Sequence, residues 1–506
     1  MKRTQLSSFR PVLAGVVLSL LCMISVSYAT LQFGSWPTHS HDAQHTGVSS
    51  IASQPLNSIH WQTPVDLAPP TGEILIHYGS PLVTAANTVI VPVKTGSDSF
   101  RVEGHNGATG ATIWTQTTGY FAPFTFFMPG LGSTLFGDQL YVPDIAGSVM
   151  VRQSPDAAEG AISHLYFYGE QNYLANPLAY QQNVVINTPL TTDAQGNLYF
   201  GFEVLGATPI GLESGLARIA ADGTGSWVSA TSVSGDPNIT KIATSCDPAL
   251  SNDGSTIYFG VDNMDFGYGY LIALDSTTLA VKNSVLLIDP WSGLPAIMTD
   301  DSSAAPMVGP DGDVYYGVLE DPFLSHNDRG WMLHFNSDLT ETKIPGSFGW
   351  DDTPSVVDAS LVASYHGSSK YLIMTKYNNY YGLGTGDGHN KVAILDPNAT
   401  EPDPILPSTT VMKEVITQLG PTHDPGFPKG AVREWCINTA AVDPYTKAVM
   451  VNSEDGKLYR WDLTSNTLSQ KIKLSGGIGE AYTPTVIGTD GTVYAINDAV
   501  LSAIGK

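Results

Sequence analysis

The sequence predicts an all-β protein, a β-propeller built from four-stranded antiparallel blades. Three observations support this fold. One sequence unit recurs along the chain, Asp-Gly turns join short apolar runs inside that unit, and no long stretch has a helical period. The chain of 506 residues also contains 50 Gly and 33 Pro, a composition that fits many short strands joined by turns.

Each unit opens with a small or polar residue, usually followed by proline, and continues into an apolar stretch. The openings are Ser80-Pro81, Thr134-Leu135, Thr188-Pro189, Asp247-Pro248, Ala305-Pro306, Thr353-Pro354, Asn438 and Thr483-Pro484. Eight openings predict eight blades. A seven-bladed ring and a tandem of β-sandwiches are the alternatives.

The interior of a unit reads as a hairpin followed by further strands. Residues 306–308 precede Asp311-Gly312, and the apolar run 314–318 follows it; Asp490-Gly491 separates 484–487 from 493–496 in the same way. Asp-Gly between apolar runs is typical of a tight hairpin turn. A third apolar run such as 270–275 then completes three to four strands for each unit.

The two ends of the chain are predicted to pair and close the ring. Only about three strands fit between Pro484 and Lys506, so the last blade lacks one. Residues 58–62 precede the first opening and read as a strand. Their pairing with the C-terminal strand would remove an exposed sheet edge.

The first 29 residues have the pattern of a secretory signal peptide. Lys2, Arg3 and Arg10 precede the apolar run 12–26, and the small residue Ala29 ends a cleavage site. We therefore expect a secreted or periplasmic protein, with no transmembrane anchor after cleavage; a retained anchor is the alternative. The formal net charge of −24 disfavours nucleic acid as a partner.

Residues 30–506 are expected to form one domain with an insertion around 376–435. The longest interval between openings, from Pro354 to Asn438, contains this stretch. Long insertions in compact folds often carry binding residues. The insertion and the loop before Thr353 supply the candidate ligand-binding residues at the channel mouth, which are Trp350, Tyr377, Asn378, His389, Arg433, Glu434 and Trp435.

Several segments resemble the quinoprotein-like, or PQQ-repeat, eight-bladed propellers. The lead-in from Trp36 to Gly47 resembles the N-terminal part of that family. Residues 104–114 and 455–463 resemble the endings of its repeats, in which a turn precedes a strand closing on Trp. The resemblance implies the eight-bladed fold for most of the chain from Trp36 to Lys506.

The same resemblance implies an enzyme hypothesis. Quinoprotein alcohol dehydrogenases of this fold bind PQQ and Ca²⁺ on the propeller axis, and a catalytic Asp accepts the alcohol proton. Residues 348–354 resemble the segment that carries this Asp, which makes Asp351 the candidate base. Neither the vicinal cysteine pair of those enzymes nor a haem motif occurs here. Alternatively, Trp350 packs between blades and the two aspartates shape the turn.

The sequence therefore favours an exported binding or scaffold propeller, because no catalytic constellation is complete. A small molecule, a carbohydrate or an envelope protein is the expected ligand or partner, since Tyr, Trp, His and Arg can stack on rings and bond their edges. The second alternative enzyme is a polysaccharide lyase, which needs His or Tyr as acid and base and Arg to neutralise a uronate. No acidic pair has the spacing of a calcium loop, so a metal site stays unassigned.

Cys246 and Cys436 have the same register in two different units. A disulfide requires Cα atoms within about 7 Å, and equivalent positions three blades apart do not meet. We predict two free, buried thiols.

Overall fold

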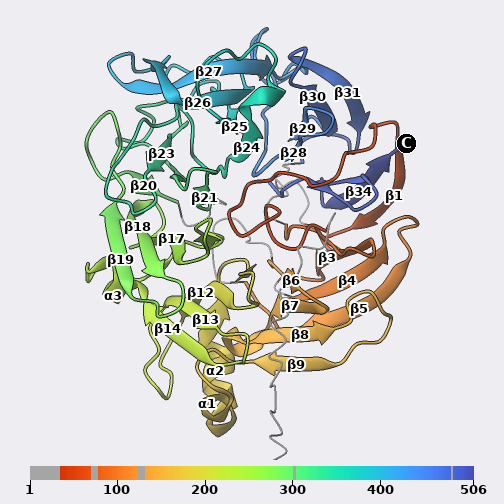
Figure 1. Ribbon diagram of the computed structural model, residues 1–506, viewed down its shortest axis with the longest axis vertical. Helices are drawn as coiled ribbons and strands as arrows, with labels where there is room; N and C mark the ends of the chain where they lie inside the picture. The colour runs from red at the N-terminus through yellow and green to blue at the C-terminus, as the bar shows by residue number, and fades with distance from the viewer. Residues whose placement is uncertain (1–34, 70–77, 98, 123–130, 300–303, 480–481) are drawn as a thin grey trace, which may run out of the picture.

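The computed structural model describes residues 35–69, 78–97, 99–122, 131–299, 304–479 and 482–506. The predicted signal peptide, residues 1–29, lies outside them. The eight antiparallel sheets are arranged in a ring around a central axis, as Figure 1 shows. The predicted eight-bladed propeller is therefore confirmed. No helix in the described part of the chain combines the length and apolarity needed to cross a bilayer.

The first four blades follow the chain in order. Blade 1 contains β2 (Leu82–Val83), β3 (Thr88–Lys94), β4 (Phe100–Asn106) and β5 (Thr112–Thr118). Blade 2 contains β6 (Thr134–Phe136), β7 (Gln139–Pro143), β8 (Val149–Gln153) and β9 (Ile162–Leu165). Blade 3 contains β10 (Val184–Ile186), β11 (Thr191–Thr192), β12 (Leu198–Val204), β13 (Gly215–Ile219) and β14 (Gly225–Ser229). Blade 4 contains β15 (Lys241–Ile242), β16 (Ala249–Leu250), β17 (Thr256–Asp262), β18 (Gly267–Asp275), β19 (Val281–Leu286) and β20 (Ile297–Met298).

The other four blades complete the ring. Blade 5 contains β21 (Met307–Val308), β22 (Val314–Val318) and β23 (Trp331–Phe335). Blade 6 contains β24 (Ser355–Asp358), β25 (Tyr371–Tyr377), β26 (Lys391–Pro402) and β27 (Thr410–Leu419). Blade 7 contains β28 (Ala441–Asp443), β29 (Ala448–Ser453), β30 (Lys457–Asp462) and β31 (Thr467–Lys473). Blade 8 contains β32 (Val486–Ile487), β33 (Val493–Asn497), β34 (Val500–Gly505) and β1 (Ser58–Pro64).

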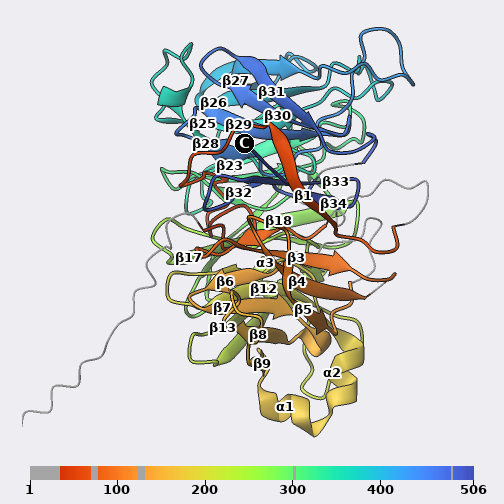
Figure 2. The ribbon, with the colours of Figure 1, turned by 90° about the vertical axis from the view of Figure 1, so that its right-hand side faces the viewer.

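Short helices lie in the connections. They are η1 (Ile145–Gly147), α1 (Glu170–Ala175), α2 (Pro177–Asn183), α3 (Ala230–Ser234) and η2 (Ala359–Leu361). Helices α1 and α2 project from the rim of the ring between blades 2 and 3, as Figure 2 shows.

Burial within a blade follows the distance of each strand from the central axis. All five residues of β22 are buried, because this strand lies between two others and between neighbouring blades. The outer strand β31 alternates exposed and half-buried residues, as expected for a sheet edge facing water. The Asp-Gly turns also form as predicted: Gly312 and Gly491 have φ of 90° and 84°, values that glycine adopts without strain.

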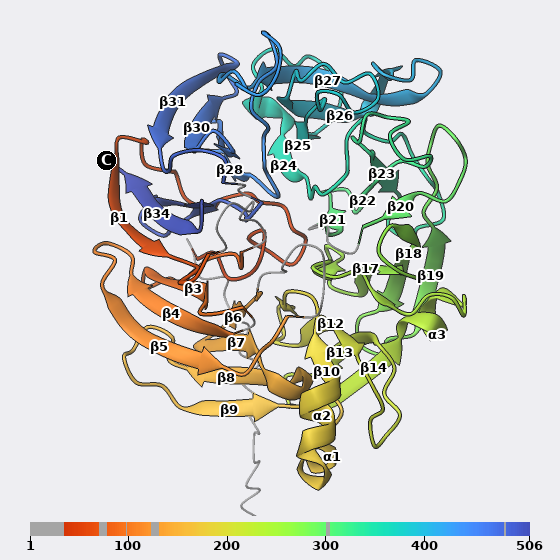
Figure 3. The same ribbon diagram turned by 180° about the vertical axis from the view of Figure 1, so that it is seen from behind.

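The ring closes through the two ends of the chain. Strand β1 pairs with β34 from Ser58 with Gly505 to Pro64 with Val500, and Figure 3 shows the two strands side by side. The predicted closure is confirmed. Blade 5 differs from the four-stranded expectation, because the segment after β23 forms no regular fourth strand and pairs with β23 at isolated bridges, Met332 with Gly346 and Phe335 with Thr342.

The N-terminal residues 36–54 form an inner ring around the central axis. The N–H of Trp36 donates to Val83 O in blade 1, and the N–H of Gln54 donates to Gly491 O in blade 8. Between these ends the segment hydrogen-bonds at or beside the first strand of each blade in order. These contacts fall on Val83, Leu135, Leu190, Leu250, Val308, Val356, Val442 and Gly491. The lead-in therefore connects all eight blades.

Residues 376–435, the expected insertion, form the end of β25, the β26–β27 hairpin and the loops on either side. Strands β26 and β27 have 12 and 10 residues, so much of the added length extends blade 6 outward.

Candidate functional site

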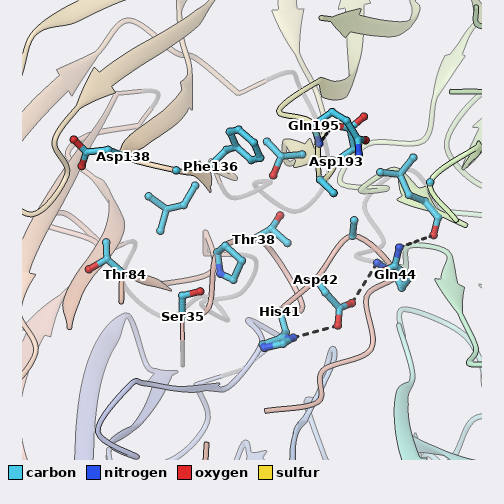
Figure 4. A pocket seen from close by; sticks show the side chains of 18 of the residues that line it. Ser35, Thr38, His41, Asp42, Gln44, Thr84, Phe136, Asp138, Asp193 and Gln195 are labelled. Atoms are coloured by element: carbon cyan, nitrogen blue, oxygen red, sulfur yellow. Dashed lines mark hydrogen bonds and ion pairs between the residues drawn. The ribbon is translucent and has the colours of Figure 1, made fainter. Parts of the chain in front are cut away.

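A pocket of about 510 Å³ lies where the inner ring meets the first turns of blades 1 to 4 (Figure 4). Thr84 comes from blade 1, Phe136 and Asp138 from blade 2, and Asp193 and Gln195 from blade 3. Blade 4 adds Leu250 and Asp253, and the inner ring adds Thr38, His41, Asp42 and Gln44. Pockets that hold small molecules commonly have this volume.

Local hydrogen bonds hold the walls of this pocket in place. Asp193 Oδ1 accepts the N–H groups of Gln195 and Asn197 at 2.9 and 2.8 Å, which shapes the turn between β11 and β12. Gln44 Nε2 donates to Leu250 O at 3.2 Å, so the inner ring is fixed to blade 4. Asp42 Oδ1 accepts from the N–H of Gln44, and its Oδ2 lies 3.1 Å from His41 Nδ1.

The pocket is electrostatically negative. Its lining contains five carboxylates, Asp42, Asp138, Asp156, Asp193 and Asp253, and no Lys or Arg. Hydrogen bonds from Ser251 and Ser255 lower the pKa of Asp253 to about 2. Burial opposes the charge of Asp42, but hydrogen bonds from His41 and Thr46 outweigh it and lower the pKa. An anionic ligand is therefore disfavoured, whereas hydroxyl or ammonium donors find acceptors.

The pocket also offers apolar contact. Phe136, Leu135, Pro37 and Leu250 line it beside the carboxylates. A ligand with both polar edges and an apolar face fits such a lining, and sugars have this character.

The candidate residues of the sequence lie around the other ends of the inner strands, in blades 6 and 7. Asp351 and Trp350 occupy the loop that leads into β24. Trp350 is half-buried, and its N–H donates to Arg329 O at 3.1 Å. Asp351 is buried and has a φ of 52°, an unusual conformation for a residue other than glycine. Both residues border a void of about 10 Å³.

A buried lysine accompanies Asp351. Lys376 Nζ lies 3.7 Å from Asp351 Oδ2 and 4.4 Å from the centre of the Tyr482 ring. The ammonium has no hydrogen-bond partner among the described residues. Thr375 Oγ1 donates to Asp352 Oδ2, and burial raises the pKa of Asp352 to about 7 although Lys376 opposes the shift. Asp351, Asp352 and Lys376 thus form a buried cluster of two acids and one base.

Three other candidate residues are buried between blades. The Arg329 guanidinium lies 4.3 Å from the centre of the Tyr377 ring. Asn378 Nδ2 donates to Trp435 O at 3.0 Å, and the N–H of Trp435 donates to Asn378 Oδ1 at 3.3 Å, which joins blade 6 to blade 7. Tyr377, Asn378 and Trp435 are at most 2% exposed. Their contacts in this structure are thus with the protein itself, and their role toward a ligand stays a prediction.

The remaining candidates lie nearer the surface. His389 is half-exposed and its Nδ1 lies 2.7 Å from Asp387 Oδ2. Arg433 Nη1 lies 3.6 Å from both Asp424 and Glu454. The N–H of Glu434 donates to Glu454 Oε1 at 3.0 Å. Arg433 is therefore already neutralised by two carboxylates, which leaves it less able to neutralise a uronate.

The described residues around Asp351 give little support to a site for PQQ with Ca²⁺. Calcium requires six to eight oxygen ligands, yet no group of three His, Cys, Asp or Glu side chains converges anywhere in the described residues. The Lys376 ammonium lies 3.7 Å from Asp351 Oδ2, and its positive charge would repel a calcium ion bound to Asp351. The void that the described residues form beside Asp351 has a volume of about 10 Å³, which is room for about one water molecule.

The pocket beside the inner ring was not among the sites expected from the sequence. Several of its residues belong to turns that, in the sequence, indicate a hairpin but not a binding site, such as Asp253-Gly254. An acidic residue recurring in the first turn of successive units was the available signal, because these turns converge at one mouth of a propeller.

Comparisons with known proteins agree with this architecture. No family model matches the sequence, and no curated protein matches it. Among solved structures, a europium-containing methanol dehydrogenase has 10% identity and a TM-score of 0.54, with 91% of this chain and 89% of that chain covered. Saccharomyces cerevisiae Sqt1 has 11% identity and a TM-score of 0.50, with coverage of 90% and 99%. BamB from Moraxella catarrhalis has 12% identity and a TM-score of 0.42, with coverage of 81% and 92%.

At these identities the similarity establishes the fold alone. The chain has the fold of the quinoprotein-like eight-bladed β-propellers, as the sequence resemblance predicted. One fold of this kind hosts many functions, so function has to be argued from the sites.

Proposed function

We propose that this protein is an exported binding propeller that holds a neutral or cationic polar small molecule, such as a carbohydrate, in the pocket beside the inner ring. The observation that carries the proposal is a pocket of about 510 Å³ lined by five Asp and no Lys or Arg. Sugar hydroxyls can donate to these carboxylates while Phe136 contacts an apolar sugar face. Export rests on the signal-peptide pattern of residues 1–29.

The two enzyme alternatives have less support from the geometry. Asp351 is buried against Lys376, and the described donor set around it gives little support to a calcium site. For a lyase, Arg433 is paired with two carboxylates and Tyr377 is buried under Arg329. A binding role needs neither arrangement.

Isothermal titration calorimetry with the mature protein tests the proposal. The probes are neutral oligosaccharides, cationic amino sugars and uronate oligosaccharides. We expect neutral or cationic probes to bind and uronates not to bind. Preferential binding of uronates would contradict the electrostatic argument, and no binding by any neutral or cationic probe would contradict the proposed ligand class.

Two exposed pocket residues provide variants that leave the fold intact. Gln195→Ala removes a polar contact for either ligand class, and Asp138→Asn removes one negative charge. We expect Gln195→Ala to weaken all binding and Asp138→Asn to weaken cationic probes more than neutral ones. Gln182→Ala, an exposed glutamine on α2 outside the pocket, is the matched control. Equal affinity of all variants would place the ligand elsewhere.

A further inference from the structure

We propose that one face of blades 4 and 5 docks a partner protein through an apolar segment of that partner flanked by Lys or Arg. The docking surface, here the blade 4–5 patch, consists of Met264, Phe266, Ile288, Trp291, Leu294 and Phe323. It is separate from the pocket beside the inner ring, and it stands whether or not that pocket binds a sugar.

The exposure of the blade 4–5 patch is the first observation. Its six side chains are 38% to 60% exposed, with Met264 at 60% and Phe323 at 52%. Single exposed apolar residues are ordinary on a protein surface. Six large ones from three adjoining loops form a concentration that is typical of a binding surface.

Contacts between the loops show that the three loops adjoin one another. The rings of Phe266 and Phe323 are 6.3 Å apart at an angle of 87°. Ser292 Oγ donates to Asp321 O at 2.5 Å, which joins the loop of Trp291 to the loop of Phe323. Gly267, next to Phe266, pairs with Met298 of β20, a few residues after Leu294.

Two buried carboxylates hold the loops in fixed conformations. Asp289 accepts from the N–H groups of Trp291 and Ser292 with Oδ1, and from the N–H of Asp321 and Trp331 Nε1 with Oδ2. Glu320 accepts three backbone N–H groups of the following loop at 2.7 to 3.2 Å. A surface already ordered before binding loses little conformational entropy when a partner docks.

The charge of the loops selects the partner. Residues 262–267, 287–296 and 319–328 contain no Lys or Arg. Three of their acidic residues are buried, whereas Asp265 is exposed and Asp321 and Asp328 are half-buried. A second copy of this chain and an anionic membrane would both be repelled by this surface, and the whole chain has a formal net charge of −24. An apolar segment with Lys or Arg beside it complements both the patch and its negative surroundings.

Fluorescence anisotropy with two labelled synthetic peptides tests the proposal. One peptide consists of Leu and Lys, and the other has every Lys replaced by Glu. We expect the Lys peptide to bind, with an affinity that falls at high salt, and the Glu peptide not to bind. Equal binding of both peptides would overturn the charge argument.

Variants locate the binding surface. The double variant Phe266→Ser with Phe323→Ser should weaken the Lys peptide at least about tenfold, because each aromatic side chain contributes more than one factor of ten when fully buried. Tyr445→Ser, at an aromatic residue 58% exposed on blade 7, is the matched control. Thermal unfolding checks that each variant remains folded. Unchanged affinity of a folded double variant would overturn the proposal.

Two further measurements address the other occupants. Sedimentation velocity of the unmodified protein should show a monomer, and flotation with phosphatidylglycerol vesicles should show no binding. A dimer abolished by the double variant, or vesicle binding abolished by it, would overturn the proposed partner in favour of that occupant.

Discussion

His45 Nε2 lies 3.2 Å from Asp247 Oδ2, and neither side chain is exposed to solvent. His45 belongs to the inner ring, whereas Asp247 opens the fourth sequence unit at the inner strands of blade 4. His45 Nδ1 lies 2.7 Å from Pro306 O of blade 5, so both ring nitrogens face acceptors. One side chain of the lead-in thereby links two neighbouring blades.

The His45–Asp247 pair predicts a pH-dependent contribution to stability. Burial alone would lower the pKa of His45, but the Asp247 carboxylate and Pro306 O outweigh it and raise the pKa above 6.5. The stabilisation is therefore fully present below pH 6.5 and is lost as the pH rises through the folded-state value. His45→Gln leaves Asp247 buried without its counter-charge and should lower the unfolding free energy by about 3 kcal/mol at pH 6.

Chemical unfolding of the native protein and of His45→Gln between about pH 5 and about pH 9 measures this difference in unfolding free energy. This range covers the pH at which histidine side chains usually titrate. The difference between native protein and His45→Gln should shrink as the pH rises. His366→Gln, at an exposed histidine, is the control and should be neutral. A difference independent of pH would show that the pair is not charged.

At Asp352, in contrast to His45, a neutral side chain is expected to stabilise the folded protein at alkaline pH. Burial raises the pKa of Asp352 to about 7 in the folded protein, above its ordinary 3.8. Its favourable contribution is present below pH 3.8 and is lost as the pH rises through about 7, which costs up to about 4 kcal/mol at higher pH. Asp352→Asn should therefore stabilise the protein at about pH 8, where most of the Asp352 carboxyl groups of the native protein are ionised.

Thermal unfolding of Asp352→Asn at acid and alkaline pH checks this expectation, with the exposed Glu159→Gln as control. The asparagine can still accept the hydrogen bond from Thr375 Oγ1. Destabilisation at pH 8 relative to the native protein would argue that the electrostatic attraction between Asp352 and Lys376 outweighs the cost of burial.

The close packing around Gly47 predicts that the inner ring tolerates no larger side chain at this position. Its φ is 66°, and a Cβ there would lie 2.9 Å from Ala440 O, Ser355 Oγ and Thr439 Cγ2. Gly137 has a φ of 58° but no atom within 4 Å of such a Cβ. Gly137→Ala should cost about 1 kcal/mol from the backbone alone, and Gly47→Ala about 2 kcal/mol or more beyond that. Equal losses in denaturant unfolding would mean that the inner ring adjusts without strain.

The two cysteines predict unreactive thiols in the folded protein. Cys246 and Cys436 are buried and neither forms a disulfide, as the sequence predicted. Burial raises the pKa of Cys246 to about 12, so it is protonated at neutral pH. Maleimide should label neither thiol in the native protein and should label both in denaturant without reductant. Rapid native labelling would reveal opening between blades.

The repeats and the closure of the ring were determined by the sequence, because hairpins depend on neighbouring residues. Asp311-Gly312 and Asp490-Gly491 specify turns through the φ that Gly tolerates, and the strands around them follow from alternating apolar runs. The strand at 58–62 was predictable from the missing outer strand of the last blade. These features depend on local geometry and on the need to pair a sheet edge.

The location of the pocket and the burial of several candidate residues were decided only by the tertiary structure. Tyr377 and Trp435 look like ligand-stacking aromatics in the sequence, yet both pack between blades 6 and 7 or against Arg329. The pocket combines the inner ring with turns from four blades that are far apart along the chain. Which polar turns meet, and which aromatics are buried, depends on how the blades pack around the axis, and that packing is set by contacts between distant residues.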